Sequence, residues 1–343
     1  MTKKLTYASA GVSLDRWEKA YKRMKRLVDA TRTREALSKV GTFGGLFKIP
    51  RGYREPVLVT STDGVGTKLK IAFLMRRHDT VGEDLVNHCI NDILVQGAQP
   101  LFFLDYMGCG KLKPSVAADV VKGFARACKR EGVTLLGGET AEMPGFYAPG
   151  EYDLAGFVVG VVERKKIITG ARIRPGDVLY GLPSTGLHTN GYSLARRVFF
   201  DRARWRVSRY VPELRTTLGE ALLRPHRSYA KTLRRPVDRG WIKGLAHITG
   251  GGLTDNLPRI LPAGRSAAID ARAWRTPPLF RLIQEMGRVS DAEMHRTFNM
   301  GVGMVAAVSP RHRAAFEAHL RRRRERFFVV GEVQRGRRMV RYG

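Results

Sequence analysis

Short apolar runs alternate with helix-spaced segments in the first half of this chain, and no other feature constrains its fold as strongly. Residues 56–60 and 101–106 have the length and the β-branched or aromatic content of buried strands. After each of them comes a segment, 84–95 and 115–131, whose apolar side chains recur at helical spacing. This alternation predicts an α/β or α+β fold.

The same kinds of element continue to the end of the chain. Other elements that we expect include a helix over 15–38, a strand at 133–136 that ends in a turn at 137–140, and strands at 152–162, 178–182, 267–269, 303–308 and 327–333. An Arg-Pro-Gly-Asp turn at 174–177 precedes a fresh strand, and 343 residues are enough for two hydrophobic cores. We therefore expect two packed domains, residues 1–170 and 171–343.

The charge of the chain is strongly positive. It carries 61 Lys and Arg against 31 Asp and Glu, a formal net charge of +30. Clustered positive charge is the electrostatic footprint of nucleic-acid binding, but here the excess is spread along the chain without a helix-turn-helix or zinc-finger pattern. We expect an arginine-rich solvated surface that steers anionic substrates, and no dedicated nucleic-acid partner. Incidental affinity for polyanions stays open as an alternative.

Targeting signals are not evident in the sequence. No stretch approaches the ~20 apolar residues of a membrane span, and no apolar run follows the first lysines as a secretory signal requires. The cysteines Cys89, Cys109 and Cys128 lack both metal-ligand and disulfide-framework spacing. We therefore expect a protein of the reducing cytoplasm.

A glycine-rich turn follows the first expected strand. In Asp63-Gly-Val-Gly-Thr-Lys68, the residues Gly64 and Gly66 allow backbone N–H groups to approach a phosphate, and Lys68 can add a point charge there. The segment is not a Walker A sequence. The alternative is a tight strand-to-helix turn in which the aspartate only caps the helix.

Three carboxylates stand at or near the ends of expected elements. Asp63 begins the glycine-rich turn, Asp92 lies among apolar residues of a helix, and Glu139 follows two glycines after a strand. Oxygen ligands of this kind, few in number, suit Mg²⁺ ions that bridge ATP phosphates. The alternative for Asp92 is a place on the polar stripe of its helix.

Histidines and glycines mark two loops of the second half. His188 lies in a glycine-flanked loop, where it can polarise a carbonyl, bind a phosphate or shuttle a proton, or be only structural. His247 precedes Ile-Thr and the three glycines 250–252, which can present N–H groups to a phosphomonoester or form an ordinary flexible turn.

Taken in order, these segments resemble the phosphoribosylformylglycinamidine cyclo-ligase family, also called aminoimidazole ribonucleotide synthetases. The resemblance rests on DGVGTKL at 63–69, GGETAEMPG at 137–145, HTNGYS at 188–193 and HITGGG at 247–252. It extends from about residue 7 to residue 333, and the nine-residue string is far more specific than any single glycine loop.

The resemblance implies an enzyme of de novo purine biosynthesis. Formylglycinamidine ribonucleotide and ATP would give 5-aminoimidazole ribonucleotide, ADP and phosphate, through phosphorylation of the formyl amide oxygen and attack by the amidine nitrogen. It also implies a homodimer in which strands of the N-terminal domains form a shared barrel, with a C-terminal α/β domain packed on each.

The resemblance also implies roles for individual residues. Asp63, Asp92 and Glu139 would hold Mg²⁺ with ATP. The other ATP-binding residues would be Gly44 and Gly45 of a mobile loop, and Gly64, Gly66, Thr67 and Lys68 of the turn. His188, Asn190 and Lys68 would be catalytic, and Thr249, Gly250, Gly251 and Gly252 would bind the ribose phosphate.

Other members of the wider ATP-binding superfamily are the alternatives. A selenophosphate synthetase would carry a reactive Cys near the N-terminal glycine loop, and no cysteine precedes Cys89. A formylglycinamidine synthase would be much longer, and a thiamine monophosphate kinase remains a further possibility. The basic segments 199–220 and 321–343 depart from the family, but they lie outside the motifs and concern the surface.

Overall fold

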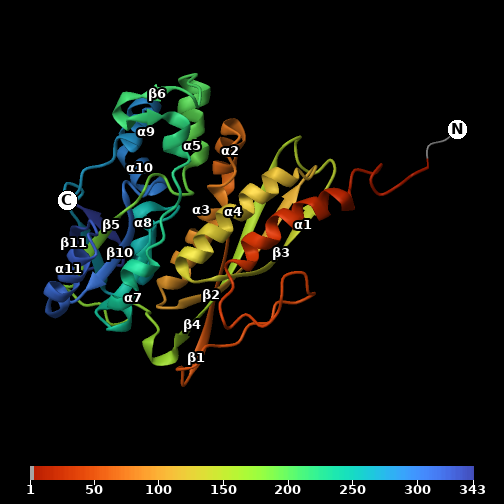
Figure 1. Ribbon diagram of the computed structural model, residues 1–343. Helices are drawn as coiled ribbons and strands as arrows, with labels where there is room; N and C mark the ends of the chain where they lie inside the picture. The colour runs from red at the N-terminus through yellow and green to blue at the C-terminus, as the bar shows by residue number, and fades with distance from the viewer. Residues whose placement is uncertain (1–3) are drawn as a thin grey trace.

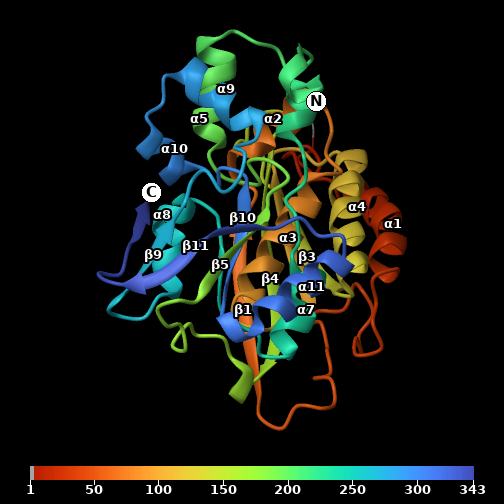
Figure 2. The same cartoon turned by 90° about the vertical axis from the view of Figure 1, so that its left-hand side faces the viewer.

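Two sheets, each packed against helices, make up the computed structural model, which describes residues 4–343 (Figures 1 and 2). The α/β class and the arrangement in two domains are confirmed at this level. The first sheet uses strands between residues 56 and 163, and the second uses strands between residues 178 and 342. The domain boundary near residue 170 stays a prediction.

The N-terminal half contains a four-stranded sheet in the order β1-β4-β2-β3. The elements are α1 (Leu14–Asp29), β1 (Pro56–Gly64), α2 (Leu69–Met75), α3 (Val81–Leu94), β2 (Gln99–Cys109), α4 (Pro114–Glu131), β3 (Thr134–Glu142) and β4 (Tyr152–Glu163). β2 and β3 run parallel, and the other neighbours are antiparallel. Helices α3 and α4 cover one face of the sheet, and α1 packs outside α4 (Figure 1).

The C-terminal half contains a six-stranded sheet in the order β12-β9-β11-β5-β10-β8. Its strands are β5 (Val178–Pro183), β8 (Ile242–His247), β9 (Arg265–Ile269), β10 (Val302–Val308), β11 (Phe328–Arg335) and β12 (Val340–Tyr342). Its helices include α5 (Tyr192–Arg196), α6 (Leu218–Leu222), α7 (Ala230–Asp238), α8 (Gly252–Asn256), α9 (Pro278–Gly287), α10 (Asp291–Thr297) and α11 (Arg313–Arg322). A short hairpin joins β6 (Tyr210–Val211) to β7 (Thr216–Thr217).

The face of the first sheet that α3 and α4 leave open carries apolar side chains. Leu58 is 55% exposed, Phe157 49% and Tyr106 36%. Alternate residues of each strand point to opposite faces, so the buried partners of these side chains lie against the helices. Both faces of the sheet are therefore apolar: α3 and α4 cover one of them, and the other is uncovered.

Two local expectations are wrong. The first helix ends at Asp29 rather than Ser38, because the Thr31 hydroxyl donates to the carbonyl of Val28 and accepts the N–H of Leu135, which ties the chain to β3. The expected turn at 137–140 lies within β3. A Cβ at Gly138 would stand 2.2 Å from the Asp105 carboxylate, so this glycine is needed for close strand packing.

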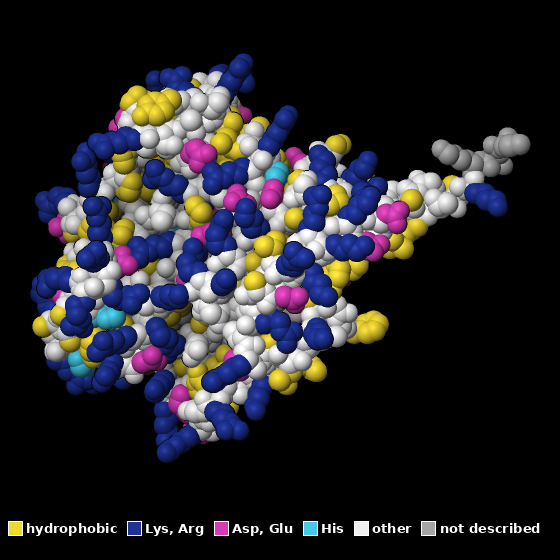
Figure 3. Space-filling model, in the orientation of Figure 1, with side chains coloured by type: hydrophobic (Ala, Val, Ile, Leu, Met, Phe, Trp, Pro, Cys, Tyr) yellow, Lys and Arg dark blue, Asp and Glu magenta, His cyan; other side chains and the backbone are white. Residues whose placement is uncertain are grey.

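Basic side chains are distributed over the whole visible face of the molecule, with acidic ones between them (Figure 3). All three cysteines are free and buried. Among residues 4–343, no helix is both long and apolar enough to cross a membrane.

Candidate functional site

A cleft of about 670 Å³ lies between the two domains. One wall comes from β1 and α3, and the other comes from β8 and the short helix η5 (Leu257–Ile260). The volume falls within the range of small-molecule sites. Its titratable lining residues are Asp63, His88, Asp92, His247 and Arg259.

Two carboxylates and two imidazoles meet in the cleft. His88 Nε2 lies 2.6 Å from Asp63 Oδ2 and 3.8 Å from Asp92 Oδ2, and His247 Nδ1 lies 2.8 Å from Asp92 Oδ1. Ser61 of β1 donates its hydroxyl to Asp92 Oδ2 at 3.0 Å, which orients that carboxylate. The imidazoles are buried, whereas the Asp63 and Asp92 side chains are 38% and 30% exposed toward the cleft.

The contacts within this group shift its pKa values. Burial acts to raise the pKa of Asp63 and of Asp92, but the hydrogen bonds from His88 and His247 outweigh it and lower both pKa values. Burial acts to lower the pKa of His88, yet the hydrogen bond and charge of Asp63 outweigh it and raise that pKa. For His247, burial dominates and lowers the pKa. These contacts therefore favour the ionised form of both carboxylates and the charged form of His88, whereas burial favours the neutral form of His247.

Further polar contacts lie behind this group. His88 Nδ1 is 2.8 Å from the Thr189 hydroxyl, which is 3.3 Å from His226 Nδ1. His226 Nε2 in turn lies 2.9 Å from His247 Nε2. Asn91 donates to the Arg227 carbonyl and accepts the N–H of Tyr229, so its orientation is fixed beside both imidazoles.

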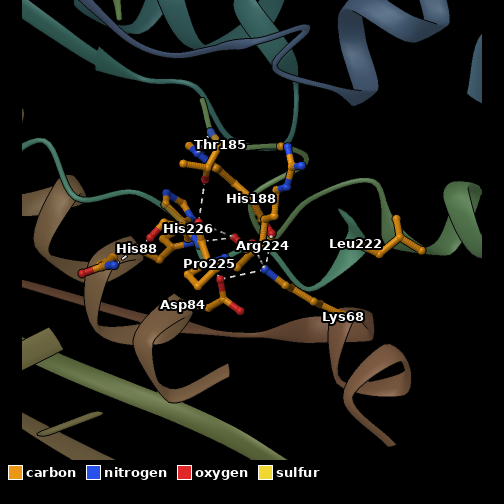
Figure 4. A network of polar contacts seen from close by, with 12 residues as sticks. Lys68, Asp84, His88, Thr185, His188, Leu222, Arg224, Pro225 and His226 are labelled. Atoms are coloured by element: carbon orange, nitrogen blue, oxygen red, sulfur yellow. Dashed lines mark hydrogen bonds and ion pairs between the residues drawn. The ribbon is translucent and has the colours of Figure 1, made fainter. Parts of the chain in front are cut away.

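His188 does not line the cleft. Its ring stacks on His226 with centroids 4.0 Å apart, and its Nε2 accepts the N–H of Thr185 at 3.2 Å (Figure 4). The side chain is buried, and burial holds the pKa of His188 well below its usual value. His188 is therefore a neutral imidazole that lies behind the cleft, stacked on His226.

Lys68 is fully buried and points away from solvent. Its Nζ donates to Asp84 Oδ1 at 2.7 Å, to the Arg224 carbonyl at 2.7 Å and to the His188 carbonyl at 3.1 Å (Figure 4). Burial raises the pKa of Asp84 to about 6 and lowers the pKa of Lys68. This geometry makes Lys68 a strut between the domains, and its assignment to ATP phosphates stays a prediction.

Glu139 lies apart from the other two carboxylates. The register runs across the sheet from Asp63 to Gly156, Asp105 and Gly138, so Asp63 and Gly138 share a face. Glu139 is the next residue of β3 and points to the other face, three strand spacings or about 14 Å from Asp63. The structure thus brings Asp63 and Asp92 together, but not Glu139, and its role as a metal ligand stays a prediction.

The expected nucleotide turn has the conformation that its glycines allow. Gly66 has φ +65°, and Gly66, Thr67 and Lys68 form one turn of 3₁₀ helix after β1. Thr67 Oγ1 lies 3.1 Å from the Ser193 hydroxyl. Gly44 and Gly45 lie in an exposed loop after α1. Their assignment to ATP, like that of the turn, stays a prediction.

The glycine run of the second domain begins at the cleft. Thr249 lines it, and the three glycines lead into α8. Gly250 lies beside Asn190, whose Oδ1 would stand 3.2 Å from a Cβ at that position. Arg259, in η5 directly after α8, also lines the cleft. The expected phosphate segment and Asn190 are thus neighbours, and their roles stay predictions.

Sequence analysis did not single out His88, His226 or Arg259. For His88 a signal exists, because Asp84, His88 and Asp92 are spaced by four residues and so share one face of α3. His226 and Arg259 meet the site only through tertiary packing, and no local pattern in the sequence points to them.

Comparisons with known proteins match both halves of the chain. The AIR synthase related protein, N-terminal domain, matches residues 47–162, and the corresponding C-terminal domain matches residues 174–343. The phosphoribosylformylglycinamidine cyclo-ligase of Desulfitobacterium hafniense is 53% identical over 329 residues, with 96% of each chain covered. That of Alkaliphilus metalliredigens is 50% identical over 338 residues, covering 98% of this chain and 97% of the relative.

Solved structures share the fold at low sequence identity. A thiamine-monophosphate kinase from Stenotrophomonas maltophilia has a TM-score of 0.70 at 18% identity, covering 92% of this chain and 94% of the other. The hydrogenase maturation protein HypE in complex with ATP has a TM-score of 0.66 at 16% identity, covering 92% and 88%.

Proposed function

The chain belongs to the phosphoribosylformylglycinamidine cyclo-ligase family, and on this premise we propose that it closes the imidazole ring of 5-aminoimidazole ribonucleotide at the expense of ATP. The observation that carries this proposal is the cleft between the domains, which combines Asp63, His88, Asp92 and His247 with the cation of Arg259. Enzymes of this family act in purine biosynthesis, and the chain is an enzyme of the same type.

The proposed reaction has two steps whose atoms balance. The formyl amide oxygen of formylglycinamidine ribonucleotide attacks the γ-phosphorus of ATP, and ADP leaves. The amidine nitrogen then attacks the activated carbon, and the C–O bond breaks with release of phosphate and a proton. Phosphorylation makes a poor leaving group a good one. The attacking nitrogen is already tethered to the carbon, so the substrate supplies much of the proximity.

The protein contributes binding and orientation. Thr249 and Arg259 line the cleft, the glycine run follows Thr249 directly, and together they are proposed to hold the ribose phosphate. Asn190 lies beside Gly250, close to the same end. His188 is proposed to act indirectly, because it stacks on His226 and supports the imidazoles that face the substrate. The position of the cleft between the two domains is proposed to keep water away from the activated intermediate.

ATP is proposed as the phosphoryl donor, supported by the complex of the structurally similar HypE with ATP. The Mg²⁺ prediction has a weaker basis in the residues. The Asp63 and Asp92 carboxylates suit Mg²⁺, but Glu139 is remote and two imidazoles face the same carboxylates. Since Mg²⁺ prefers oxygen ligands, this donor set does not fit it well, and Mg²⁺ is proposed only as the ion that accompanies ATP.

A homodimer is proposed to cover the open sheet face. Leu58, Tyr106 and Phe157 expose apolar surface there, and such a face on a soluble protein marks an interaction site. A shared barrel with a second copy would bury it and remove the sheet edges. The cytoplasmic location and the lack of a dedicated nucleic-acid partner stay predictions.

The test is a direct assay with product analysis. Protein, formylglycinamidine ribonucleotide, ATP and Mg²⁺ are expected to give ADP, phosphate and a diazotisable aminoimidazole in equal amounts. The Asp92→Asn variant is expected to lose activity by about 100-fold or more, because it removes a charge that orients His247 in the cleft. Asp238→Asn, on the exposed end of α7, is the matched control and keeps activity. Folded wild-type protein that leaves the substrate intact contradicts the proposal.

A further inference from the structure

Two cavities of about 540 and 700 Å³ join into one groove that crosses from the C-terminal to the N-terminal domain. The smaller cavity lies between α7 and α11, which are neighbours in both views (Figures 1 and 2). The larger cavity lies where β1 begins and β4 ends, beside the short helix η2 (Arg164–Lys166). Arg234 and Asp238 of α7 line both cavities, so the groove is continuous.

We propose that this basic groove binds a linear chain of phosphate groups, such as inorganic polyphosphate. Six Lys or Arg side chains line each cavity, and Arg234 belongs to both, so eleven cations accompany three carboxylates. The whole chain carries 61 Lys and Arg against 31 Asp and Glu, a ratio of about two to one. The excess of cations in the basic groove is therefore greater than the average composition of the chain supplies.

The three carboxylates of the basic groove already have partners. Asp238 accepts a hydrogen bond from Arg234 Nε at 3.0 Å. Glu163 accepts the N–H groups of the two residues that precede β1, at 2.8 and 3.1 Å. The Glu55 carboxylate lies 3.4 Å from the Arg164 guanidinium. These carboxylates therefore leave most of the positive charge in the groove without compensation.

Most cations of the basic groove are exposed and have no acidic partner. Of the eleven, nine form no ion pair within residues 4–343. Five of them line the smaller cavity: Lys231, Arg235, Arg239, Arg322 and Arg323. The other four line the larger cavity: Arg51, Arg54, Lys165 and Lys166. A cleft lined by one sign of charge focuses the potential, and the guanidinium group matches phosphate oxygens with paired N–H donors. The groove therefore attracts a phosphorylated anion.

The backbone that carries these cations is held on both sides of the domain junction. The buried His319 of α11 donates a ring N–H to the Thr232 carbonyl of α7 at 2.9 Å, which ties the two helices together at the smaller cavity. Arg234 Nη1 reaches the Gly97 carbonyl of the N-terminal domain at 3.4 Å. The groove is thus formed before any ligand enters, and binding has to order only the side chains.

The lining suits a phosphate chain better than RNA or an acidic peptide. Single-stranded nucleic acid binds through aromatic rings on which successive bases stack. Among the lining residues that the structure describes, Tyr53 is the one Phe, Tyr or Trp, and its hydroxyl donates to Gln99 at 3.3 Å. Peptides anchor apolar side chains in pockets, whereas the smaller cavity is lined by charged side chains and His319.

The density of charge along the ligand supports the same choice. In inorganic polyphosphate, neighbouring phosphates share an oxygen atom, whereas in RNA a ribose separates them. A phosphate chain therefore brings more charges to the same length of groove. Binding there is independent of the proposed ring closure, because no described residue lines both the basic groove and the interdomain cleft.

The test is fluorescence anisotropy with end-labelled inorganic polyphosphate, without nucleotide substrates, at about 0.15 M salt, where charges are screened beyond about 8 Å. The double variants Arg235→Gln with Arg322→Gln and Lys165→Gln with Lys166→Gln each remove two cations from one half of the groove. Each is expected to weaken binding by about 10-fold or more, because charge-assisted phosphate contacts are lost. Poly-uridine RNA and poly-glutamate with the same number of charges are expected to bind at least about 10-fold more weakly.

The matched control is Arg335→Gln with Arg337→Gln, which removes the same charge from the exposed turn between β11 and β12. It is expected to change the affinity by less than about 2-fold. Equal losses in the control and the groove variants would show diffuse attraction to the net charge and overturn the proposal. An effect in only one half of the groove, or RNA or peptide binding as tightly as polyphosphate, overturns it as well. So does a larger loss in Arg259→Ala, because the chain would then lie in the interdomain cleft.

Discussion

Replacement of Lys68 by methionine separates two roles for this lysine. The glycine-rich turn points to a phosphate contact, whereas the structure places the ammonium group in a fully buried ion pair. All three of its protons are used, on Asp84 and on the carbonyls of His188 and Arg224. Methionine preserves most of the volume but removes the charge and the three donors. The change therefore tests the strut directly.

The expected cost follows from what the substitution leaves behind. Asp84 would keep only the N–H of His226 at 2.6 Å, and two buried carbonyls would lose a charged donor. Breaking a buried pair from one side costs about 3–5 kcal/mol, because an uncompensated charge remains. The pKa of Asp84, already raised by burial to about 6, would rise further and limit the loss at low pH. Lys68→Met combined with Asp84→Leu is expected to recover about 1–3 kcal/mol of that loss.

The assay is urea unfolding at one fixed protein concentration, followed by far-ultraviolet circular dichroism, with ATP affinity measured by calorimetry on the folded variant. Lys70→Met is the matched control. Its ion pair with Glu151 is half-exposed, so it is expected to cost less than about 1 kcal/mol.

A contrary result has a clear form. If Lys68→Met unfolds with the same free energy as wild type but no longer binds ATP, the strut is wrong and the lysine serves the phosphates. A double variant that is less stable than the single variant would also refute the reasoning, because it would mean that the buried Asp84 charge was never the source of the loss.

Three further predictions concern other parts of the molecule. Glu142 accepts hydrogen bonds from the backbone N–H groups of Ser13 and Leu112 and from the Arg16 guanidinium. Burial acts to raise the pKa of Glu142, but these hydrogen bonds outweigh it and lower that pKa. The ionised Glu142 therefore stabilises the fold above the usual pKa of a carboxyl group, and this stabilisation is lost as the pH falls. Glu142→Gln is therefore expected to cost about 2–4 kcal/mol at neutral pH, and less in acid, by urea unfolding at several pH values. Phe157→Glu is expected to convert the proposed dimer to monomers in light scattering, whereas an unchanged mass would contradict the shared barrel. Arg259→Ala is expected to raise KM for the nucleotide substrate about 10-fold or more with a smaller effect on kcat, and the reverse pattern would remove it from the phosphate end.

Local patterns in the sequence predicted most elements well. The runs at 56–60 and 101–106 became β1 and β2, and the segments at 84–95 and 115–131 became α3 and α4. These elements follow from the spacing of apolar side chains, which one segment carries by itself. The prediction of a turn at 137–140 was wrong because Gly138 packs against Asp105 on the neighbouring strand. No local pattern in the sequence contains that contact.

In the candidate site, too, the sequence predicted some features correctly, and contacts between distant segments decided the others. Asp63 and Asp92 were predicted to converge, and they do, through His88 and His247. Glu139 was expected beside them, but it is Gly138, one residue earlier in β3, that shares the face of Asp63. Glu139 therefore points to the opposite face of the sheet. His188 looked like a loop histidine facing the substrate, and instead it is buried behind His226.

The sequence by itself determined which chemical groups this protein owns, where its strands and helices begin, and which family it resembles, because spacing and motif are properties of single segments. Only the tertiary structure decided which of those groups meet. Lys68 pairs with Asp84 sixteen residues away, whereas His88 reaches Thr189 across 101 residues and His247 reaches Asp92 across 155. Such contacts depend on sheet register and on the packing of one domain against the other, and their energies appear only once the chain has closed those long loops.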